Sequence, residues 1–498
     1  MHKLYCFKSK VFVKREIVKM LRNNNKSSKS DKYFSKIEMY NFLFICFLTI
    51  MMYKTRKQLL KTQIDVYNST ESSFYGVECA YTYRVTKPPK TWHYTKIVIE
   101  YNPKKFCTKD FRNFTDKGGS IFRVQAFSVY EMVTTTTDYI GNETYEAKIL
   151  LTFPTKYILM IILTYVNGQA MESTRHTSPV LQHLSGSPFT LNVLRTLSPK
   201  NLIRYCSSKE SGFVSGRWIK CGGAISGLER CGAWQTSDFD FDKIYGFRWV
   251  PYVCQYHQYT NDEVKRCFAR NKWSSIVFAG DSHMRYRAYH WATRLYGSCH
   301  SCVKTHIKML FNKIPRIEWI FDARGTRLPL SFPNISLPLE KYIHPKVRRS
   351  KFSTPFPVES MKSKLMLLNF GHWVLRETGN LKFMQEKITA YAQAARILQM
   401  SGTKVVWVNT VSLPWRTDKS VVEWKENTSP YRVKFFNQLA DDIMEQYGIP
   451  VVDAFQISDG RIAATHDQTH YTKKLPGNDY GGVVENAISN AIINLLCN

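Results

Sequence analysis

From residue 276 to the end of the chain, short apolar runs alternate with longer segments of helical periodicity. This alternation predicts an α/β domain over residues 271–498, with a parallel sheet covered by helices. The expected strands are 276–279, Arg316–Asp322, Lys364–Asn369, Val405–Asn409 and Pro450–Asp453; the expected helices are Tyr286–Leu295, Leu381–Met400, Tyr431–Tyr447 and Val483–Leu496. In an open sheet of this kind, functional residues gather at the carboxyl ends of the strands.

The turn after the first of these strands carries a candidate nucleophile. The apolar run breaks at Gly280, Asp281 and Ser282 follow, and a helical pattern continues to a stop at Gly297. A serine in this position is exposed at the edge of the sheet, near the positive end of a helix. Asp281 and Ser282 also suit a simple helix cap, so the turn alone supports both interpretations.

Two later stretches favour the catalytic interpretation. Asp467 precedes His470 by three residues, so one loop can present both side chains. The carboxylate can then orient the imidazole while the other ring nitrogen faces a hydroxyl. Asn369 ends a further predicted strand, and its amide could donate a hydrogen bond to a developing oxyanion.

Three sequence blocks therefore occur in a fixed order: GDSH at 280–283, NFGHW at 369–373 and DQTH at 467–470. In this order they resemble the SGNH/GDSL hydrolase superfamily and, more closely, its PC-esterase branch, which includes glycan O-acetyltransferases and esterases. The chain is most similar to the NXPE (neurexophilin and PC-esterase domain) family, and the resemblance covers most of its length. The elements Gly216-Arg217-Trp218 and Trp249-Val250-Pro251-Tyr252-Val253-Cys254 also resemble elements that precede the GDS block in PC-esterase relatives.

The resemblance assigns catalytic roles to five residues. Ser282 would be the nucleophile, His470 the base that takes its proton, and Asp467 the residue that orients His470. The oxyanion hole would combine the backbone N–H of Ser282, the side chain of Asn369 and the backbone N–H of Gly325.

Three further residues beside these blocks are weaker candidates for substrate contacts, namely His283, Arg285 and His372. No metal-binding motif, P-loop or dinucleotide fingerprint is evident in the sequence. The resemblance implies an acyl donor such as acetyl-CoA if the protein is a transferase, and no bound cofactor.

The preceding part of the chain has a different texture. Residues 76–198 are rich in strand candidates at the spacing of a β-sandwich: Thr95–Tyr101, Ser120–Phe127, Thr144–Phe153, Tyr157–Tyr165 and 185–193. This segment resembles the immunoglobulin/filamin-like domain of NXPE proteins. Residues 199–270 are dense in Cys, Gly and Trp, and we expect them to clamp the catalytic domain.

The amino terminus predicts a membrane anchor. Residues 1–39 are basic, residues 40–54 are apolar and bordered by tyrosines, and residues 55–75 read as a polar stem. The apolar run is shorter than the ~20 residues of a typical transmembrane helix, so a signal-peptide core or a buried helix are alternatives. No small-residue cleavage site follows it, which favours an uncleaved signal anchor with a cytoplasmic tail.

Two signals place the rest of the chain in the secretory pathway, in the Golgi or at the cell surface, with secretion as an alternative. Ten cysteines follow the apolar run, which suits disulfides in an oxidising compartment. Cys299 and Cys302, with His306 nearby, could also form a redox or metal site. Glycosylation sequons occur at Asn68, Asn113, Asn142, Asn334 and Asn427.

The net charge of +31 indicates an anionic partner, and the candidates are nucleic acid, an anionic membrane and acidic glycans. A lumenal chain with sequons argues against nucleic acid and for glycans, including sialylated or sulfated ones. The leading hypothesis is acyl transfer through an ester of Ser282, most simply an acetyl ester. The alternative is a non-catalytic, neurexophilin-like recognition protein at the cell surface or secreted.

Overall fold

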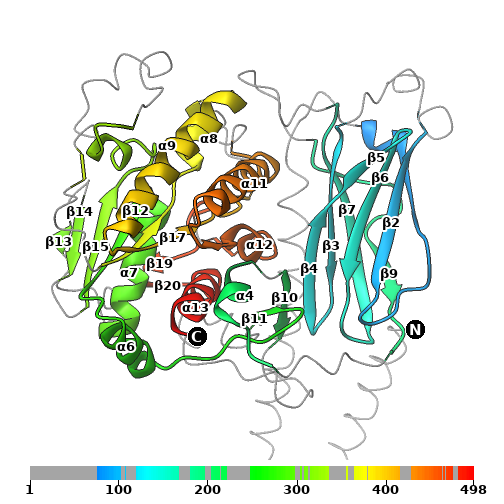
Figure 1. Cartoon of the computed structure of the whole chain (residues 1–498). Helices are drawn as coiled ribbons and strands as arrows, with labels where there is room; N and C mark the ends of the chain where they lie inside the picture. The colour runs from blue at the N-terminus through cyan, green and yellow to red at the C-terminus, as the bar shows by residue number, and fades with distance from the viewer. Residues whose placement is uncertain are drawn as a thin grey trace, which may run out of the picture. The chain divides into compact units, whose positions relative to one another are not determined.

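We describe a computed structural model of the whole chain (Figure 1). The residues that it describes are 76–102, 107, 119–167, 180–196, 204–213, 215–220, 247–297, 303–304, 308–311, 315–335, 355–356, 364–377, 380–414, 428–462, 464–465, 467–474 and 480–498. Within these ranges no helix is long and apolar enough to cross a membrane. The predicted tail, anchor and stem (1–75) lie outside them, as do Cys299, Cys302 and His306.

The carboxyl-terminal part is built on a seven-stranded sheet of order β13-β14-β15-β12-β16-β17-β18. Five of these strands are parallel: β12 (Ser275–Gly280), β15 (Arg316–Phe321), β16 (Leu365–Leu368), β17 (Lys404–Val408) and β18 (Val451–Val452). Beyond β15 the sheet ends in two antiparallel strands, β14 (Lys308–Phe311) and β13 (Val303–Lys304), which precede β15 in the chain. If the five parallel strands are numbered by their order in the chain, they lie across the sheet in the order 2-1-3-4-5. The strand order therefore reverses between β12 and β16.

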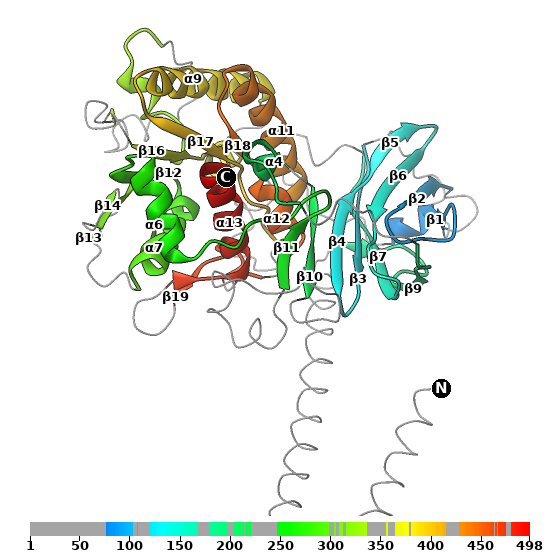
Figure 2. The same cartoon turned by 60° about the horizontal axis from the view of Figure 1, so that its bottom comes forward.

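Helices cover both faces of this sheet, as the alternation predicts (Figures 1 and 2). They are α6 (Asn261–Arg270), α7 (Ser282–Tyr296), α8 (His372–Glu377), α9 (Leu381–Met400), α11 (Pro430–Gln446), α12 (Ala454–Asp459) and α13 (Val483–Cys497). The predicted helices at 381–400, 431–447 and 483–496 are confirmed to within one residue at each end. Helix α7 ends at Gly297, whose left-handed backbone (φ 81°) is the conformation that a glycine cap supplies.

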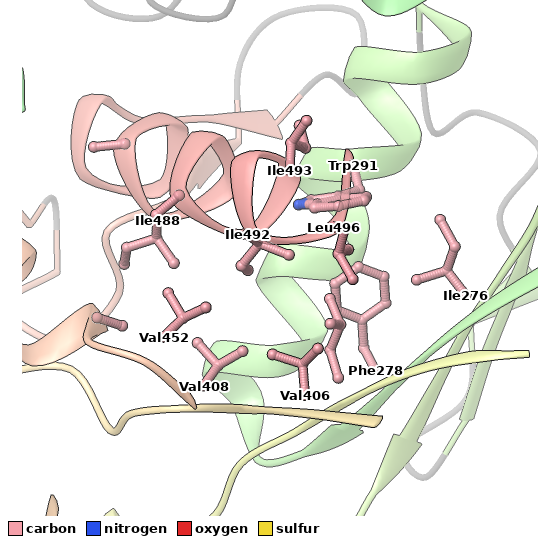
Figure 3. Close-up of a cluster of buried hydrophobic side chains, with 14 of the residues drawn as sticks. Ile276, Phe278, Trp291, Val406, Val408, Val452, Ile488, Ile492, Ile493 and Leu496 are labelled. Carbon is pink, nitrogen blue, oxygen red and sulfur yellow. The ribbon is translucent and has the colours of Figure 1, made fainter. Parts of the chain in front are cut away.

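Residues of β12 alternate between two cores, which is why the strand reads as a continuous apolar run. Ile276 and Phe278 pack with α7 and α13, where Trp291 and Ile492 lie (Figure 3). Val277 and Ala279 belong to the opposite cluster, which contains residues of α9 and α11. Because both faces of β12 are buried, the turn at its end is held rigidly from both sides.

The amino-terminal part of the described chain forms two antiparallel sheets around one core. The first has the order β1-β2-β6-β5, with β1 (Tyr81–Val85), β2 (Tyr94–Tyr101), β6 (Thr144–Leu150) and β5 (Asp138–Gly141). The second contains β3 (Ile121–Phe127), β4 (Glu131–Thr136), β7 (Lys156–Tyr165), β8 (Gln182–His183) and β9 (Phe189–Asn192). The five strands predicted from the sequence are therefore present, whereas β1, β4, β5 and β8 were not anticipated.

The second sheet continues past the boundary that the sequence predicts at residue 198. Strands β10 (Gly216–Lys220) and β11 (Phe247–Pro251) extend it, because β10 pairs with β4. A buried ion pair reinforces this junction, with Nε of Arg217 lying 2.9 Å from Oε1 of Glu131. Two strands of the expected clamp thus belong to the sheet of the β domain, since their backbone partners lie there.

Buried contacts also join this sheet to the α/β part. The guanidinium of Arg123 on β3 donates to the Asp459 carboxylate at the end of α12, at 2.7 Å. The indole N–H of Trp218 on β10 donates to the carbonyl of Ile457, at 3.0 Å.

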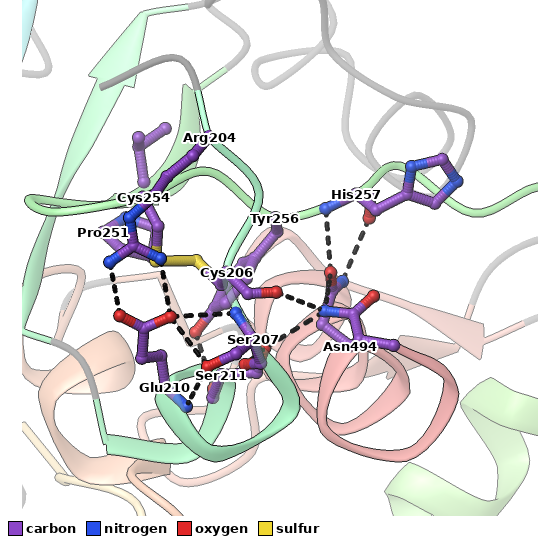
Figure 4. The surroundings of a disulfide bond; sticks show 12 residues. Arg204, Cys206, Ser207, Glu210, Ser211, Pro251, Cys254, Tyr256, His257 and Asn494 are labelled. Carbon is purple, nitrogen blue, oxygen red and sulfur yellow. Dashed lines mark hydrogen bonds and ion pairs between the residues drawn. A yellow bond between two sulfur atoms is a disulfide. The ribbon is translucent and has the colours of Figure 1, made fainter. Parts of the chain in front are cut away.

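Three disulfides occur among the described residues: Cys79–Cys107, Cys206–Cys254 and Cys267–Cys497. The second joins Cys254 to the residue that lies two positions before α4 (Ser208–Phe213) (Figure 4). In the same region Asn494 of α13 donates to the carbonyl of His257. The third links α6 to the end of α13. These bonds fit an oxidising compartment, and the sequon residues Asn142 and Asn334 are both exposed.

The partly buried carboxyl of Asp441 on α11 makes the stability of the fold depend on pH. Burial raises the pKa of this carboxyl to about 8, and the nearby acids Asp453, Asp442 and Glu445 act in the same direction, while a hydrogen bond from Asn409 opposes them. A folded pKa above the unfolded value means that the native state binds the extra proton, so stability falls as pH rises from about 4 to about 8. Asp441→Asn is therefore expected to stabilise the protein by about 1–2 kcal/mol at pH 8.5 and to change little at pH 4.

Chemical unfolding of the disulfide-intact chain at both pH values measures this difference. Asp442→Asn, at the exposed neighbouring position, serves as the matched control; Asp442 is only one of the acids that raise the Asp441 pKa, so its replacement should have a smaller effect at pH 8.5 and little effect at pH 4. An Asp441→Asn effect that is the same at both pH values would contradict the raised pKa.

Candidate active site

The turn between β12 and α7 is formed by a glycine that no larger residue can replace without displacement. A Cβ atom at Gly280 would lie 2.5 Å from the backbone oxygen of Asn369 and 2.6 Å from Cγ of Met284. Both distances are shorter than side-chain contacts allow. The close approach brings the ends of β12 and β16 together where the strand order reverses, which is the position where ligands bind in such sheets.

Asp281 and Ser282 have different roles in this turn. Asp281 is the N-cap of α7, and its Oδ1 accepts the backbone N–H of His283 at 2.8 Å. Ser282 is the first helical residue and remains partly exposed. Among the described residues no acceptor takes its backbone N–H. The helix-cap interpretation thus holds for Asp281 and leaves the Ser282 hydroxyl and N–H available for other partners.

The Ser282 hydroxyl contacts a histidine from the far end of the chain. Nε2 of His470 lies 2.8 Å from Oγ of Ser282, and Nδ1 of the same ring lies 2.7 Å from Oδ2 of Asp467. The other Asp467 oxygen accepts the backbone N–H groups of Thr469 and His470, at 2.9 and 2.6 Å. The three residues predicted to act together are therefore joined in one hydrogen-bonded series.

The electrostatics of the series set the proton positions. Partial burial raises the pKa of Asp467, but hydrogen bonds from the ring and backbone of His470 outweigh this effect and hold its pKa below the usual value. Asp467 is thus an acceptor, and Nδ1 of the His470 ring carries a proton toward it. In neutral His470, Nε2 then presents its lone pair to Ser282, as a general base requires.

The loop that carries His470 is anchored by its neighbours. The buried Tyr471 donates its hydroxyl to the carbonyl of Ser412 at 2.7 Å. Next along the chain, β19 (Lys473–Lys474) pairs with β20 (Tyr480–Gly481). The backbone N–H of Tyr480 donates to Oγ1 of Thr293 on α7, at 3.1 Å. The loop is therefore attached to the helix that begins with Ser282.

An aromatic ring lies beside the imidazole, and a cation lies over that ring; sequence reasoning missed the two aromatic residues involved, Tyr286 and Trp319. The ring of Tyr286, one turn along α7 from Ser282, lies 4.4 Å from the His470 ring. The Arg285 guanidinium lies over the rings of Tyr286 and Trp319, at 5.5 and 5.4 Å. No carboxylate in the described part of the chain pairs with Arg285. The i+4 spacing from Ser282 could have identified Tyr286, whereas Trp319 comes from the neighbouring strand.

Two residues predicted to stabilise an oxyanion have their donors engaged elsewhere. Nδ2 of Asn369 donates to the carbonyl of Val408 at 2.7 Å and to Oγ1 of Thr410 at 3.1 Å, so both amide hydrogens are used to join β16 to the end of β17. The backbone N–H of Gly325 closes a turn to the carbonyl of Asp322, at 3.1 Å.

The three predicted oxyanion-hole donors differ in whether they are already engaged in this structure. Gly325 has a positive φ of 60°, and a Cβ there would lie 2.6 Å from the Phe370 ring, so the glycine serves the packing of its turn. Of the three predicted donors, the backbone N–H of Ser282 alone lacks a competing acceptor among the described residues.

The two remaining residues predicted to contact substrate are His372 and His283. His372 is the first residue of α8, and its Nε2 lies 2.9 Å from the carbonyl oxygen of Val411. The His283 ring lies between the rings of His372 and His470, at 4.7 and 5.0 Å. Both side chains are more than nine-tenths buried. The structure therefore does not present them for direct contact with a large substrate.

Comparisons with known proteins add little to this geometry. No protein-family model matches the chain, and no curated protein matches it. A solved structure from Bacteroides vulgatus ATCC 8482, described as a candidate glycoside hydrolase, aligns with 71% of this chain at 7% identity and a TM-score of 0.17. The alignment spans about half (53%) of that chain. At this level of similarity the alignment carries no argument about function.

Proposed function

We propose that this chain is a serine-dependent O-acyl esterase or transferase that acts on glycans through an acyl ester of Ser282. One observation carries the proposal: Asp467, His470 and Ser282 are linked by hydrogen bonds of 2.7 and 2.8 Å. They meet where the strand order reverses, at the carboxyl end of β12. A nucleophile, a base and a residue that orients the base are the groups that acyl transfer requires.

The chemistry follows from these positions. As Oγ of Ser282 attacks the acyl carbon, its proton passes to Nε2 of His470, and the carbonyl oxygen becomes negative. The backbone N–H of Ser282, at the positive end of α7, can donate to that oxygen. Collapse of the adduct breaks the bond to the departing alcohol of an ester, or to the departing thiol of a donor such as acetyl-CoA, and the leaving group takes the proton from His470.

The second half of the cycle reverses these steps. A water or sugar hydroxyl gives its proton to His470 and attacks the Ser282 ester. The acyl group leaves on the new acceptor, and the proton returns to the serine. Water as acceptor gives hydrolysis, whereas a sugar hydroxyl gives transfer from a donor such as acetyl-CoA.

The assignments of superfamily, substrate and cellular location are parts of this proposal. We assign the α/β part to the SGNH type and the sandwich to the immunoglobulin/filamin-like type, because the GDSH and DQTH blocks of an NXPE-like sequence carry the meeting side chains. The NXPE resemblance supports a glycan O-acetyl group as the substrate. The disulfides support a lumenal or extracellular location in the Golgi or at the cell surface.

Charge supports an anionic glycan. The chain carries a net charge of +31. Arg285 lies one turn from Ser282 without a carboxylate partner among the described residues, so a sulfate or carboxylate of the substrate could pair with it.

Covalent labelling tests the proposal. The full chain, purified from a eukaryotic secretory host with its disulfides intact, is incubated with an activated acetyl ester or a fluorophosphonate. Intact mass and peptide mapping should find one adduct per chain, on Ser282. Ser208→Ala, which removes an exposed hydroxyl bonded to the carbonyl of Asn498, should label like the unmodified protein. Candidate glycans added to the acetylated protein then separate hydrolysis from transfer.

The recognition-protein alternative predicts the opposite result. Folded, glycosylated protein that forms no adduct on Ser282 with either reagent would overturn the enzymatic proposal.

A further inference from the structure

Beneath the Ser282 turn, three buried side chains converge on one point. Asp281, His283 and His372 are 1%, 9% and 7% exposed. One ligand-type atom from each lies within 4.8 Å of the others. Asp281 and His283 come from the β12–α7 turn, and His372 comes from the β16–α8 turn, so the point lies between the two strand ends where the strand order reverses. The acyl-transfer mechanism above uses none of the three.

The His372 ring directs an unpartnered nitrogen toward the Asp281 carboxylate. Its Nε2 lies 2.9 Å from the Val411 carbonyl, which can only accept a hydrogen bond, so Nε2 carries a proton. In the neutral ring Nδ1 then holds a lone pair. That atom is buried without a hydrogen-bond partner and lies 3.6 Å from Oδ2 of Asp281. A lone pair facing a carboxylate oxygen in a buried site is repulsive unless a positive charge lies between them.

The spacing favours a metal ion over a proton. A charge-assisted N–H···O hydrogen bond spans about 2.7–2.9 Å, which is shorter than the 3.6 Å observed. Two ligand atoms at about 2.0–2.2 Å from one tetrahedral ion lie roughly 3.3–3.6 Å apart. The distance of the Nδ1–Oδ2 pair matches the second arrangement, and His283 also offers a ligand atom in the group, whose atoms all lie within 4.8 Å of one another.

The neighbours of the three side chains are those of a metal site. The hydrogen bond from Nε2 of His372 to a backbone carbonyl orients the ring, as such bonds commonly do for metal-bound histidines. Oδ1 of Asp281 is engaged by the N–H of His283, which leaves Oδ2 to bind. No described residue hydrogen-bonds to a ring nitrogen of His283. Two imidazoles and one carboxylate form a ligand set suited to zinc.

We propose that Asp281, His283 and His372 bind a divalent zinc ion that joins the β12–α7 turn to the β16–α8 turn. The ion holds the His283 ring, which packs against His470, and so acts on the position of the base. It takes no part in the acyl-transfer steps, and the site stands or falls independently of the esterase proposal. The sequence shows no metal motif here because His372 lies 89 residues after His283 in the chain, too far for a local ligand spacing.

Metal content tests the site. The full chain, expressed with zinc in the medium and desalted, is analysed by inductively coupled plasma mass spectrometry. We expect about one zinc per chain. Asp281→Asn, which keeps an oxygen acceptor for the helix cap, and His372→Gln should each lower zinc content at least five-fold. His183→Gln, at a partly buried histidine of β8 in the other sheet, is the matched control and should retain it.

A second measurement on the unmodified protein avoids dependence on variants that fail to fold. Removal of zinc with dipicolinate should lower the melting temperature, and zinc should restore it. Cobalt(II) added instead should give the visible absorption of a tetrahedral site. Equal zinc in His372→Gln and the unmodified chain, or zinc-free protein that neither binds cobalt nor changes its melting temperature with zinc, would overturn the proposal.

Discussion

Replacing Ser282 with alanine is expected to lower turnover of an activated acetyl ester by at least about 1,000-fold, because the Ser282 hydroxyl is the group that His470 is placed to activate for forming the acyl ester. His470→Gln should cost a similar factor, since the Ser282 hydroxyl then keeps its proton. Initial rates at saturating and limiting ester concentrations measure both effects. A fall in kcat with little change in KM would place the loss in the chemical step.

The double variant is the sharper test. Residues that act as one unit lose their function together, so Ser282→Ala combined with His470→Gln should be no slower than either single variant. Independent roles would instead multiply the two losses. Ser208→Ala is the control and should keep full turnover. Wild-type turnover in the Ser282→Ala variant would show that the activity resides elsewhere and would refute the assignment of the nucleophile.

Breaking the ion pair between Arg287 and Glu485 is expected to cause the largest loss of stability. Nε of Arg287 on α7 lies 2.5 Å from Oε1 of Glu485 on α13, and the two side chains are 2% and 5% exposed. Arg287→Met leaves the Glu485 carboxylate buried without its partner, which should cost about 3–5 kcal/mol. Replacing both residues, Arg287→Met with Glu485→Leu, removes both charges and should recover most of that loss.

Chemical unfolding of the disulfide-intact chain measures both variants. Arg84→Met breaks the pair with Glu100, whose side chains are 59% and 46% exposed, and should change the free energy of unfolding by less than about 1 kcal/mol. If Arg287→Met is as mild as Arg84→Met, α13 is not held to α7 by this pair. The result matters for function, because α7 begins with Ser282.

Local sequence patterns predicted much of the fold and of the catalytic series. The apolar run of β12 and the periodicity of α9 depend on neighbours along the chain, so their bounds could be predicted from the sequence. The spacing of Asp467 and His470 is also local, since one turn of backbone brings the carboxylate to the ring. Strand β4 escaped notice because its Thr134-Thr135-Thr136 run lacks an apolar alternation.

The sequence by itself therefore determined the five parallel strands, the four predicted helices of the α/β part, the Ser282 turn and the Asp467–His470 pair. Tertiary structure alone decided the strand order, the extension of the β-domain sheet by β10 and β11, and the use of the Asn369 amide at the end of β17. It also decided the meeting of Asp281, His283 and His372. The physical reason is the same in each case: hydrogen-bond donors and buried charges find their partners across sequence separations that no local periodicity encodes, so their final contacts depend on how the sheet assembles.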